Sequence, residues 1–220
     1  MIKISNRLLT IANLVNDNCS IIDIGCDHGL LDIYLVNNRN NIKIIASDVN
    51  KNAIENVRNN IKKYNVNNID TRLGNGLDIV SKDEIDTIII SGMGTYTIID
   101  IFNNNIDKLD NVNDIIIQSN NNIDILRKYL VSINYYIEEE ALIKDKNIIY
   151  TVIKFKKGNR KYSNKELLLG PILLERKEEL FYELCDLEKK KLLNILDKVP
   201  NNEISYKKEI ENRIKYYSDI

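Results

Sequence analysis

The sequence predicts an α/β protein with a doubly wound, mostly parallel sheet, followed by an antiparallel pair of helices. Short runs rich in β-branched residues alternate with segments of helical length through most of the chain. Two extended segments then follow one another almost directly, which only antiparallel neighbours permit. Beyond Gly158 the apolar spacing is helical throughout. We therefore expect two domains, residues 1–158 and residues 159–220.

The parallel strands are expected where the chain is short, apolar and β-branched, because strands buried on both faces have this composition. These runs are Ser20–Gly25, Lys43–Asp48, Ile69–Gly74, Ile85–Ser91 and Asn113–Ser119. Helices are expected between them, as at Asn50–Tyr64 and Asn122–Val131, where apolar residues recur every three or four positions. The antiparallel pair is expected at Tyr135–Leu142 and Asn147–Phe155.

The tail is predicted to form a helical hairpin that packs as a coiled coil. Its first helix carries Leu173, Leu180, Leu184 and Leu187, and its second carries Tyr206, Ile210, Ile214 and Tyr217. Pro200-Asn201-Asn202 separates the two. The alternative is a helical cap on the sheet that binds nothing.

Composition excludes several classes of protein. Of 220 residues, 44% are hydrophobic and 29% are charged, which is the range of globular chains. The cysteines show no C-x-x-C spacing and there is one His, so we expect no zinc site. No apolar run approaches the roughly 20 residues that span a bilayer, and Met1–Thr10 does not resemble a secretory segment. We therefore expect a cytoplasmic protein without a membrane role, and a monomer is compatible with the sequence.

The distribution of charge favours the tail as the basic part of the chain. Residues 1–155 contain 16 basic and 20 acidic side chains, whereas residues 156–220 contain 15 and 12. An excess of this size can assist binding to a nucleic acid without proving it.

The segment DIGCDHG, Asp23–Gly29, lies where the first strand should meet its helix. Gly25 permits close backbone approach there, and amide groups at a helix start can face a polar ligand. The spacing D-x-G-x-x-x-G differs from the dinucleotide fingerprint G-x-G-x-x-G. Asp27 and His28 stand between the two glycines as polar candidates, although a single His is also often structural.

Asp48 ends the second strand about 20 residues beyond this loop. A carboxylate at that position can accept hydrogen bonds from both hydroxyls of a ribose. The alternative is that Asp48 caps the helix that begins near Asn50.

Three further loops are expected at the same edge of the sheet. In LGNGLD, Gly74 and Gly76 allow the chain to wrap around a flat ring, and Asn75 offers a donor and an acceptor. The run SGMGT, Ser91–Thr95, is either a tight turn or the floor of a pocket for a base. Asn120 follows the fifth strand, where ligands of α/β folds gather.

Together these motifs resemble the bacterial tRNA adenine N1-methyltransferase family TrmK, which modifies adenine 22. The resemblance covers essentially the whole chain and rests on DIGCDHG, LGNGL, ISGMG, IQSN and LGP, in this order. It implies a class I, Rossmann-like methyltransferase sheet, in agreement with the antiparallel end strands. The sequence departs from the family pattern, as we know it, at Leu30, Asn75, Thr95 and Ser119, where an aromatic residue, Asp, Gly and Pro are common.

The resemblance implies S-adenosylmethionine as cofactor, tRNA as partner and no metal. The residues expected to bind the cofactor are Asp23, Gly25, Cys26, Asp27, Asp48, Val49, Gly74, Asn75, Gly76, Ser91 and Gly92. The target base is expected to contact Asp27 and His28 as polar groups, Met93 as an apolar wall and Asn120 as a hydrogen-bonding partner.

Adenine N1 has a free lone pair at neutral pH, so alignment and exclusion of water should matter more than proton abstraction. The rival interpretations are a methyltransferase for another RNA or a protein, a nicotinamide-dependent oxidoreductase and a catalytically silent RNA-binding module.

Overall fold

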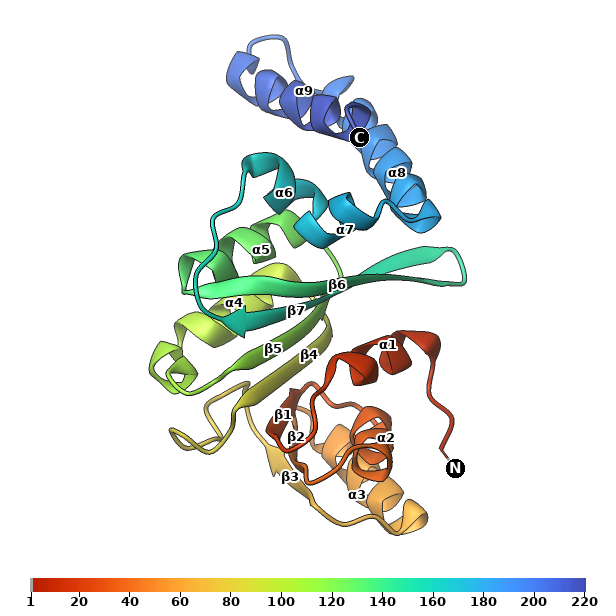
Figure 1. Ribbon diagram of the computed structural model, residues 1–220, viewed down its shortest axis with the longest axis vertical. Coiled ribbons are helices and arrows are strands. Elements are labelled where there is room, and N and C mark those ends of the chain that lie inside the picture. The colour runs from red at the N-terminus through yellow and green to blue at the C-terminus, as the bar shows by residue number, and fades with distance from the viewer. Residues whose placement is uncertain (1) are drawn as a thin grey trace. The chain divides into compact units, whose positions relative to one another are not determined.

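The computed structural model describes residues 2–220, whose contacts divide the chain into a unit that ends at Arg160 and a second unit, Lys161–Ile220. The first unit is built on one sheet of seven strands in the order β3-β2-β1-β4-β5-β7-β6 (Figure 1). Its parallel strands are β1 (Ser20–Ile24), β2 (Lys43–Asp48), β3 (Ile69–Leu73), β4 (Thr87–Met93) and β5 (Asp114–Ser119). The predicted doubly wound sheet is therefore confirmed.

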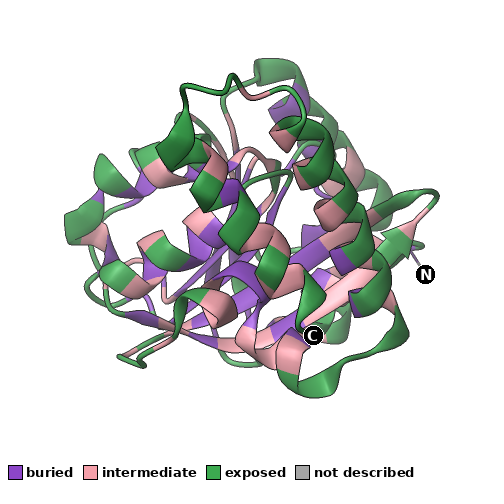
Figure 2. Ribbon diagram, turned by 90° about the horizontal axis from the view of Figure 1, so that it is seen from above, coloured by how far each residue is buried: buried purple, intermediate pink, exposed green. Residues whose placement is uncertain are grey.

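The central strands are buried because helices cover both faces of the sheet. All six residues of β5 are buried, as are the isoleucines of β1 and β4 (Figure 2). Burial on both faces explains why these strands contain unbroken isoleucine runs instead of alternating polar residues.

Two groups of helices lie along the sheet (Figure 1). One group is α1 (Asn6–Leu14), α2 (Leu30–Asn38) and α3 (Lys51–Tyr64), in which α2 contacts both of the others. The other is α4 (Thr95–Asn103) and α5 (Ile123–Ser132), which contact each other, and a 3-10 turn follows α4 at Ile106–Leu109. Helix α1, which contacts β5, β6 and β7, was not among the elements expected from the sequence.

The antiparallel pair ends the sheet as predicted. Strands β6 (Tyr135–Asp145) and β7 (Ile148–Lys157) pair with each other, and β7 pairs antiparallel with β5. Two residues connect them, and Lys146 adopts a left-handed backbone with φ 55°. A connection this short can only reverse the chain.

The fourth strand lies later than the predicted Ile85–Ser91. It spans Thr87–Met93, so Gly92 and Met93 belong to the strand, whereas the sequence suggested that they lie in a loop after it. The pairing with β5 shifts register between Ser91 and Met93, and Gly92 has φ 82°. A bulge at a glycine lets the strand continue with a changed direction, which a pattern search interprets as a turn.

The second unit contains four helices among its residues, not the two that were predicted. They are α6 (Asn164–Leu169), α7 (Pro171–Arg176), α8 (Glu179–Leu196) and α9 (Ile204–Ser218). Leu173 therefore lies on α7 and not at the start of a hairpin helix. Gly170-Pro171 separates α6 from α7, and Lys177 in a left-handed conformation ends α7.

The predicted hairpin consists of α8 and α9, which contact each other. The buried residues of these two helices are Phe181, Cys185 and Ile210, whereas Leu187 and Tyr206 are exposed. The buried stripe of α8 is thus displaced by one residue from the predicted leucines.

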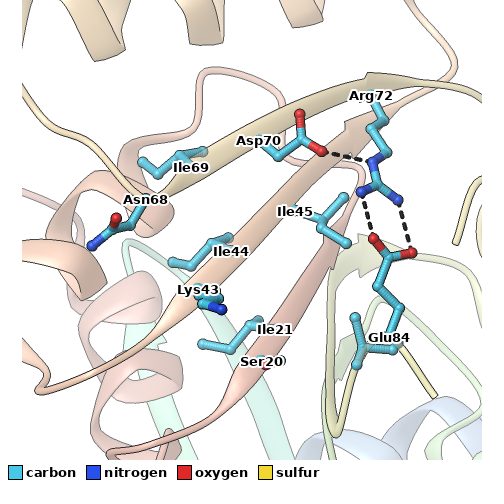
Figure 3. A pocket seen from close by; sticks show the side chains of 11 residues that line it. Ser20, Ile21, Lys43, Ile44, Ile45, Asn68, Ile69, Asp70, Arg72 and Glu84 are labelled. Carbon is cyan, nitrogen blue, oxygen red and sulfur yellow. Dashed lines mark hydrogen bonds and ion pairs between the residues drawn. The ribbon is translucent and has the colours of Figure 1, made fainter.

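Residues 74–86, between β3 and β4, contain turns in place of a helix and are attached to the sheet by Arg72 of β3 (Figure 3). Its guanidinium donates to both carboxylate oxygens of Glu84, at 2.5 and 3.0 Å, and to the Ile79 carbonyl at 2.9 Å. Asp70 accepts a further hydrogen bond from Arg72. The hydrogen bond from Arg72 holds the pKa of Glu84 below its ordinary value.

We predict that Glu84→Gln lowers the free energy of unfolding by about 1–2 kcal/mol at pH 7, because a partly buried ion pair becomes a neutral contact. The pKa of Glu84 is lowered on folding, so its contribution is present above its ordinary value of 4.5 and is lost as pH falls below it. Urea unfolding between pH 3 and pH 7 measures the difference. Glu55→Gln, at an exposed position on α3, is the control. The prediction would be contradicted if Glu84→Gln and Glu55→Gln lowered the free energy of unfolding equally at pH 7.

Candidate active site

The carboxyl ends of the five parallel strands meet at one edge of the sheet, and every site residue predicted from the sequence lies there or on the strand residues leading to it. The loop after β1 carries Gly25, Cys26, Asp27 and His28. Asp48 ends β2 and Val49 follows it, while Gly74–Gly76 follow β3. Ser91, Gly92 and Met93 end β4, and Asn120 follows β5. Parallel strands bring these loops together although they are far apart in the chain.

The loop after β1 is held to β2 through its backbone. The amides of Gly25 and Cys26 both donate to the Ser47 carbonyl, at 2.8 and 3.0 Å. The Cys26 side chain is buried, and burial raises the pKa of its thiol. Cys26 is therefore a neutral residue of the loop that helps to shape it, and its amide is occupied within the protein.

Gly25 is in contact with the end of β4. Its φ is 79°, and a Cβ at this position would lie 2.5 Å from Met93 Cε. Glycine is required here both by the left-handed conformation and by the neighbouring methionine. Two predicted site residues, Gly25 and Met93, are thus brought together from β1 and β4.

Asp27 and His28 lie on the outer side of the same loop. Their side chains are 77% and 53% exposed, and His28 Nε2 lies 3.6 Å from Asp27 Oδ1. The loop is anchored to α3 because Asn60 donates from its side chain to the His28 carbonyl at 2.9 Å. The two side chains are held on a fixed backbone and can meet a large ligand from solvent.

Asp48 does not cap the helix that follows it. The N-cap of α3 is Asn50, whose side chain accepts from the Asn52 amide at 2.9 Å. Asp48 accepts from the Asn50 amide through Oδ1 at 2.8 Å, and within residues 2–220 nothing donates a hydrogen bond to Asp48 Oδ2. Val49 beside it is 68% exposed, so an acidic group and an apolar side chain stand together at this end of β2.

In the loop after β3, the two glycines are packed against isoleucine side chains and the residue between them is exposed. A Cβ at Gly74 would lie 2.0 Å from Ile79, and one at Gly76 would lie 2.8 Å from Ile101. The Gly74 amide donates to the Asp48 carbonyl at 3.0 Å, which ties this loop to the end of β2. Asn75 between the glycines is exposed. Its amide side chain is therefore available to a ligand that also reaches Asp48.

Asn120 is fixed to the end of β4. Its backbone amide donates to the Met93 carbonyl at 2.9 Å, and its side-chain Nδ2 donates to the Gly92 carbonyl at 2.6 Å. The bulge at Gly92 therefore presents a carbonyl to the predicted hydrogen-bonding residue.

Two of the departures from the family pattern compensate each other. The buried hydroxyl groups of Thr95 and Ser119 share a hydrogen bond of 2.9 Å, and Thr95 Oγ1 also donates to the Asn121 carbonyl at 2.7 Å. Buried hydroxyls without partners would destabilise the turn, so the two residues satisfy one another next to Asn120.

Sequence reasoning missed Asp32, which lies on α2 and is fully buried with Asp23 of β1. Burial raises the pKa of Asp23 to about 7 and raises the pKa of Asp32 well above its ordinary value, and the Asp23 charge adds to the rise at Asp32. The pair therefore carries fewer than two negative charges near neutral pH. The sequence contained one sign of this buried pair, because Asp32 is the single acidic residue within the apolar run LLDIYLV.

Arg7 of α1 was also missed. Its Nη1 donates to Gln118 Oε1 at 2.5 Å, and its guanidinium lies 5.7 Å from the centre of the Tyr150 ring. It also opposes the rise in the pKa of Asp23. No local pattern could have identified it, because Arg7 and Gln118 are 111 positions apart in the sequence.

An open cavity of about 490 Å³ lies away from this edge (Figure 3). Ser20, Lys43 and Ile69, the first residues of β1, β2 and β3, contribute to its lining. Its acidic groups Asp70 and Glu84 already pair with Arg72. The cavity is therefore a separate feature at the opposite ends of the strands.

Within residues 2–220, no group of three or more His, Cys, Asp or Glu side chains is arranged to hold a metal ion. No helix in this range is long and apolar enough to cross a membrane.

The expected cofactor, S-adenosylmethionine, fits the donors and acceptors of this edge. Asp48 offers a carboxylate oxygen and Asn75 an open amide, while Gly25 lets the backbone of the β1 loop pack directly against Met93. Val49 supplies exposed apolar surface next to them. These features suit a ribose, through Asp48, and an adenine ring, through Asn75 and Val49.

Comparisons with known proteins agree with the expected family. A family model described as tRNA (adenine(22)-N(1))-methyltransferase, TrmK, matches residues 21–219. The Bacillus subtilis tRNA (adenine(22)-N(1))-methyltransferase is 29% identical over 187 residues, which are 82% of this chain and 79% of that protein.

Solved structures of relatives match nearly the full length. The B. subtilis TrmK structure has a TM-score of 0.91 at 26% identity and covers 100% of this chain and 99% of that one. Mycoplasma capricolum TrmK with the cofactor product S-adenosyl-homocysteine has a TM-score of 0.84 at 31% identity, with 98% and 96% covered. A Streptococcus pneumoniae structure in complex with S-adenosyl-L-methionine has a TM-score of 0.89 at 27% identity and covers 99% of each chain.

Proposed function

The chain belongs to the TrmK family of tRNA (adenine(22)-N(1))-methyltransferases, and we propose how its own residues carry out the family's reaction. It transfers a methyl group from S-adenosylmethionine to N1 of adenine 22 in tRNA. The observation that carries this function is the family match over residues 21–219, which includes all five loops of the carboxyl edge. Its tRNA substrate favours a cytoplasmic location. Nothing in the reaction requires a metal ion, a membrane or a second copy of the chain.

The cofactor would be held by the loops after β1, β2 and β3. Asp48 would accept hydrogen bonds from the ribose hydroxyls, Asn75 would bind the adenine edge and Val49 would lie against the ring. The backbone around Gly25, together with Ser91 and Gly92, would line the path of the sulfonium chain, above the buried Asp23 and beside Cys26. When bound, S-adenosylmethionine supplies an activated methyl group whose transfer discharges a cation.

The target adenine would approach between the β1 loop and the end of β4. Asp27 and His28 are exposed on one side, while Met93 offers an apolar wall and Asn120 a fixed amide on the other. A base within folded tRNA must be presented unpaired before it can enter such a site. Because adenine N1 has a free lone pair, these groups would orient the base and stabilise the developing positive charge without removing a proton.

The second unit would bind tRNA. The cationic excess of residues 156–220 comes from Lys156, Lys157 and Arg160, which end the first unit, whereas Lys161–Ile220 carries 12 basic and 12 acidic side chains. The helices of this unit also lie outside the sheet that holds the candidate cofactor residues. The 12 cationic side chains of the second unit, together with Lys156, Lys157 and Arg160, are suited to contacts with the phosphate backbone.

We predict that Asp48→Ala raises the dissociation constant of S-adenosylmethionine roughly 10- to 150-fold, because about 1.5–3 kcal/mol of charge-assisted hydrogen bonding is lost. Isothermal calorimetry measures it. Asn50→Ala is the matched control, since it removes the cap of α3 and leaves the Asp48 carboxylate in place. Equal affinity in the wild type and Asp48→Ala, with both folded, would remove Asp48 from the cofactor site.

We predict that Asp27→Ala and His28→Ala each lower kcat roughly tenfold or more and leave cofactor affinity nearly unchanged, as expected for groups that act mainly in the transition state. Single-turnover methylation of unmodified tRNA is paired with cofactor calorimetry, and mass spectrometry maps the product. Full turnover in both variants would refute the residue roles. Methyl groups found only on cytosine or guanine would refute the proposed reaction.

We predict that a chain ending at Arg160 still binds S-adenosylmethionine and loses most of its tRNA affinity, because the sheet is complete at Lys157. Circular dichroism establishes that the shortened chain folds, and filter binding with tRNA at several salt concentrations measures affinity. Methylation of tRNA at the full rate by the shortened chain would show that the second unit has another role.

A further inference from the structure

A series of three hydrogen bonds runs from α1 through Gln118 and Asn120 to the end of β4. Arg7 Nη1 donates to Gln118 Oε1 at 2.5 Å, and Gln118 Nε2 donates to Asn120 Oδ1 at 3.1 Å. Asn120 Nδ2 then donates to the Gly92 carbonyl at 2.6 Å. The series begins on a helix that precedes the sheet and ends on the bulge of β4.

The direction of this series is determined by its two ends. A guanidinium has only donors, so Gln118 must turn its oxygen toward Arg7 and its amino group toward Asn120. Asn120 must then turn its oxygen toward Gln118. At the other end a backbone carbonyl can only accept, which also requires the amino group of Asn120 at Gly92. Both ends therefore demand the same orientation of the Asn120 amide.

Burial makes this orientation costly to change. Gln118 is fully buried, so an oxygen left without a donor would lose a hydrogen bond that water could not replace. The Arg7 guanidinium is further positioned by the Tyr150 ring at 5.7 Å, and Arg7 Nη1 lies 3.7 Å from where a Gly92 Cβ would stand. Arg7 is thus fixed beside the same bulge that receives Asn120.

We propose that Arg7 is a positioning residue for methyl transfer, which acts through Gln118 to fix the amide of Asn120 toward the target base. This rests on the proposed role of Asn120 in binding the base. The amide of asparagine has two ends of nearly equal shape, and only one of them matches a given edge of a base. A reversed or mobile amide would misalign the adenine, and misalignment lowers the rate of a reaction that depends on orientation.

Gln118→Glu is the variant that separates orientation from packing. It has almost the same shape as the wild type and still accepts from Arg7, but an ionised carboxylate cannot donate to Asn120 Oδ1. Arg7→Met removes the donor at the start of the series and keeps a long apolar stem. Arg7→Lys keeps a cationic donor and should restore part of the rate lost in Arg7→Met.

Arg39→Met is the matched control. Arg39 is also partly buried and also binds α1, because its Nη2 donates to the Ala12 carbonyl at 2.8 Å. Its hydrogen bonds within residues 2–220 go to Ala12 and Leu35, and not to Gln118 or Asn120. If Arg7 only attached α1 to the rest of the protein, Arg7→Met and Arg39→Met would therefore have the same effect on kcat.

The full chain is assayed with unmodified tRNA, and the side-chain amide resonances of Asn120 are followed by 15N NMR without tRNA. Gln118→Glu and Arg7→Met should lower kcat roughly 10- to 100-fold with little change in the KM for tRNA or in cofactor affinity. The Asn120 amide resonances should shift in both variants, and Arg39→Met should leave kcat and these resonances unchanged.

Two outcomes would overturn the proposal. Unshifted Asn120 resonances in Arg7→Met would show that Arg7 does not orient this amide. A higher KM for tRNA or weaker cofactor binding in Arg7→Met, with kcat unchanged, would make Arg7 a direct ligand. If the wild-type protein does not methylate adenine but the Asn120 resonances still shift in Arg7→Met, the hydrogen-bond series stands and the proposed function is refuted instead.

Discussion

The reversal of strand order between β1 and β4 is the constraint on which the candidate active site depends. From β1 the chain proceeds outward through β2 to β3, and it then returns to the other side of β1 for β4 and β5. Loops that leave neighbouring strands in opposite directions leave a crevice between them, which is where α/β sheets bind ligands. The contact of Gly25 with Met93 lies at this point. A side chain at residue 25 would collide with Met93 and push the β1 loop away from the end of β4.

Much of the fold could be predicted from the sequence because burial on both faces of the sheet leaves a strong local signal. Strands β1, β2, β4 and β5 show it as a short run of isoleucines, whereas the edge strand β3, Ile69–Leu73, has a single isoleucine and no buried residue. The site loops could be found for a related reason, since Gly25, Gly76 and Gly92 occupy left-handed backbone positions that favour glycine. The errors lie where two physical causes give the same pattern. At Gly92 a bulge within β4 has the composition of a turn, so the strand was expected to end too early. In the tail, Leu173 has the spacing of the hairpin leucines, but Gly170-Pro171 and Lys177 place it on a separate short helix.

The residues that sequence reasoning missed act through partners distant in the chain. Arg7 meets Gln118 across 111 positions, and its meaning depends on β5 and β7 being adjacent to α1. Asp32 is polar in a helix that is otherwise apolar toward the sheet, and its role depends on Asp23 lying beside it. Periodicity describes one element at a time, so it cannot report pairs of this kind. The sequence therefore predicts which loops bind a ligand better than it predicts what holds their side chains.

The distribution of ionisable groups around the edge fits a reaction that needs orientation more than proton transfer. Burial raises the pKa of Asp23 to about 7, so this carboxyl group changes its charge near neutral pH. The series that reaches Asn120 contains two amides, which do not titrate, and an arginine, which remains cationic in proteins. The orientation of Asn120 is therefore maintained while the buried carboxyl pair gains or loses a proton. Arg7 also opposes the rise in the pKa of Asp23, so the carboxyl pair and this series share one cation, although no group of the series changes its own charge.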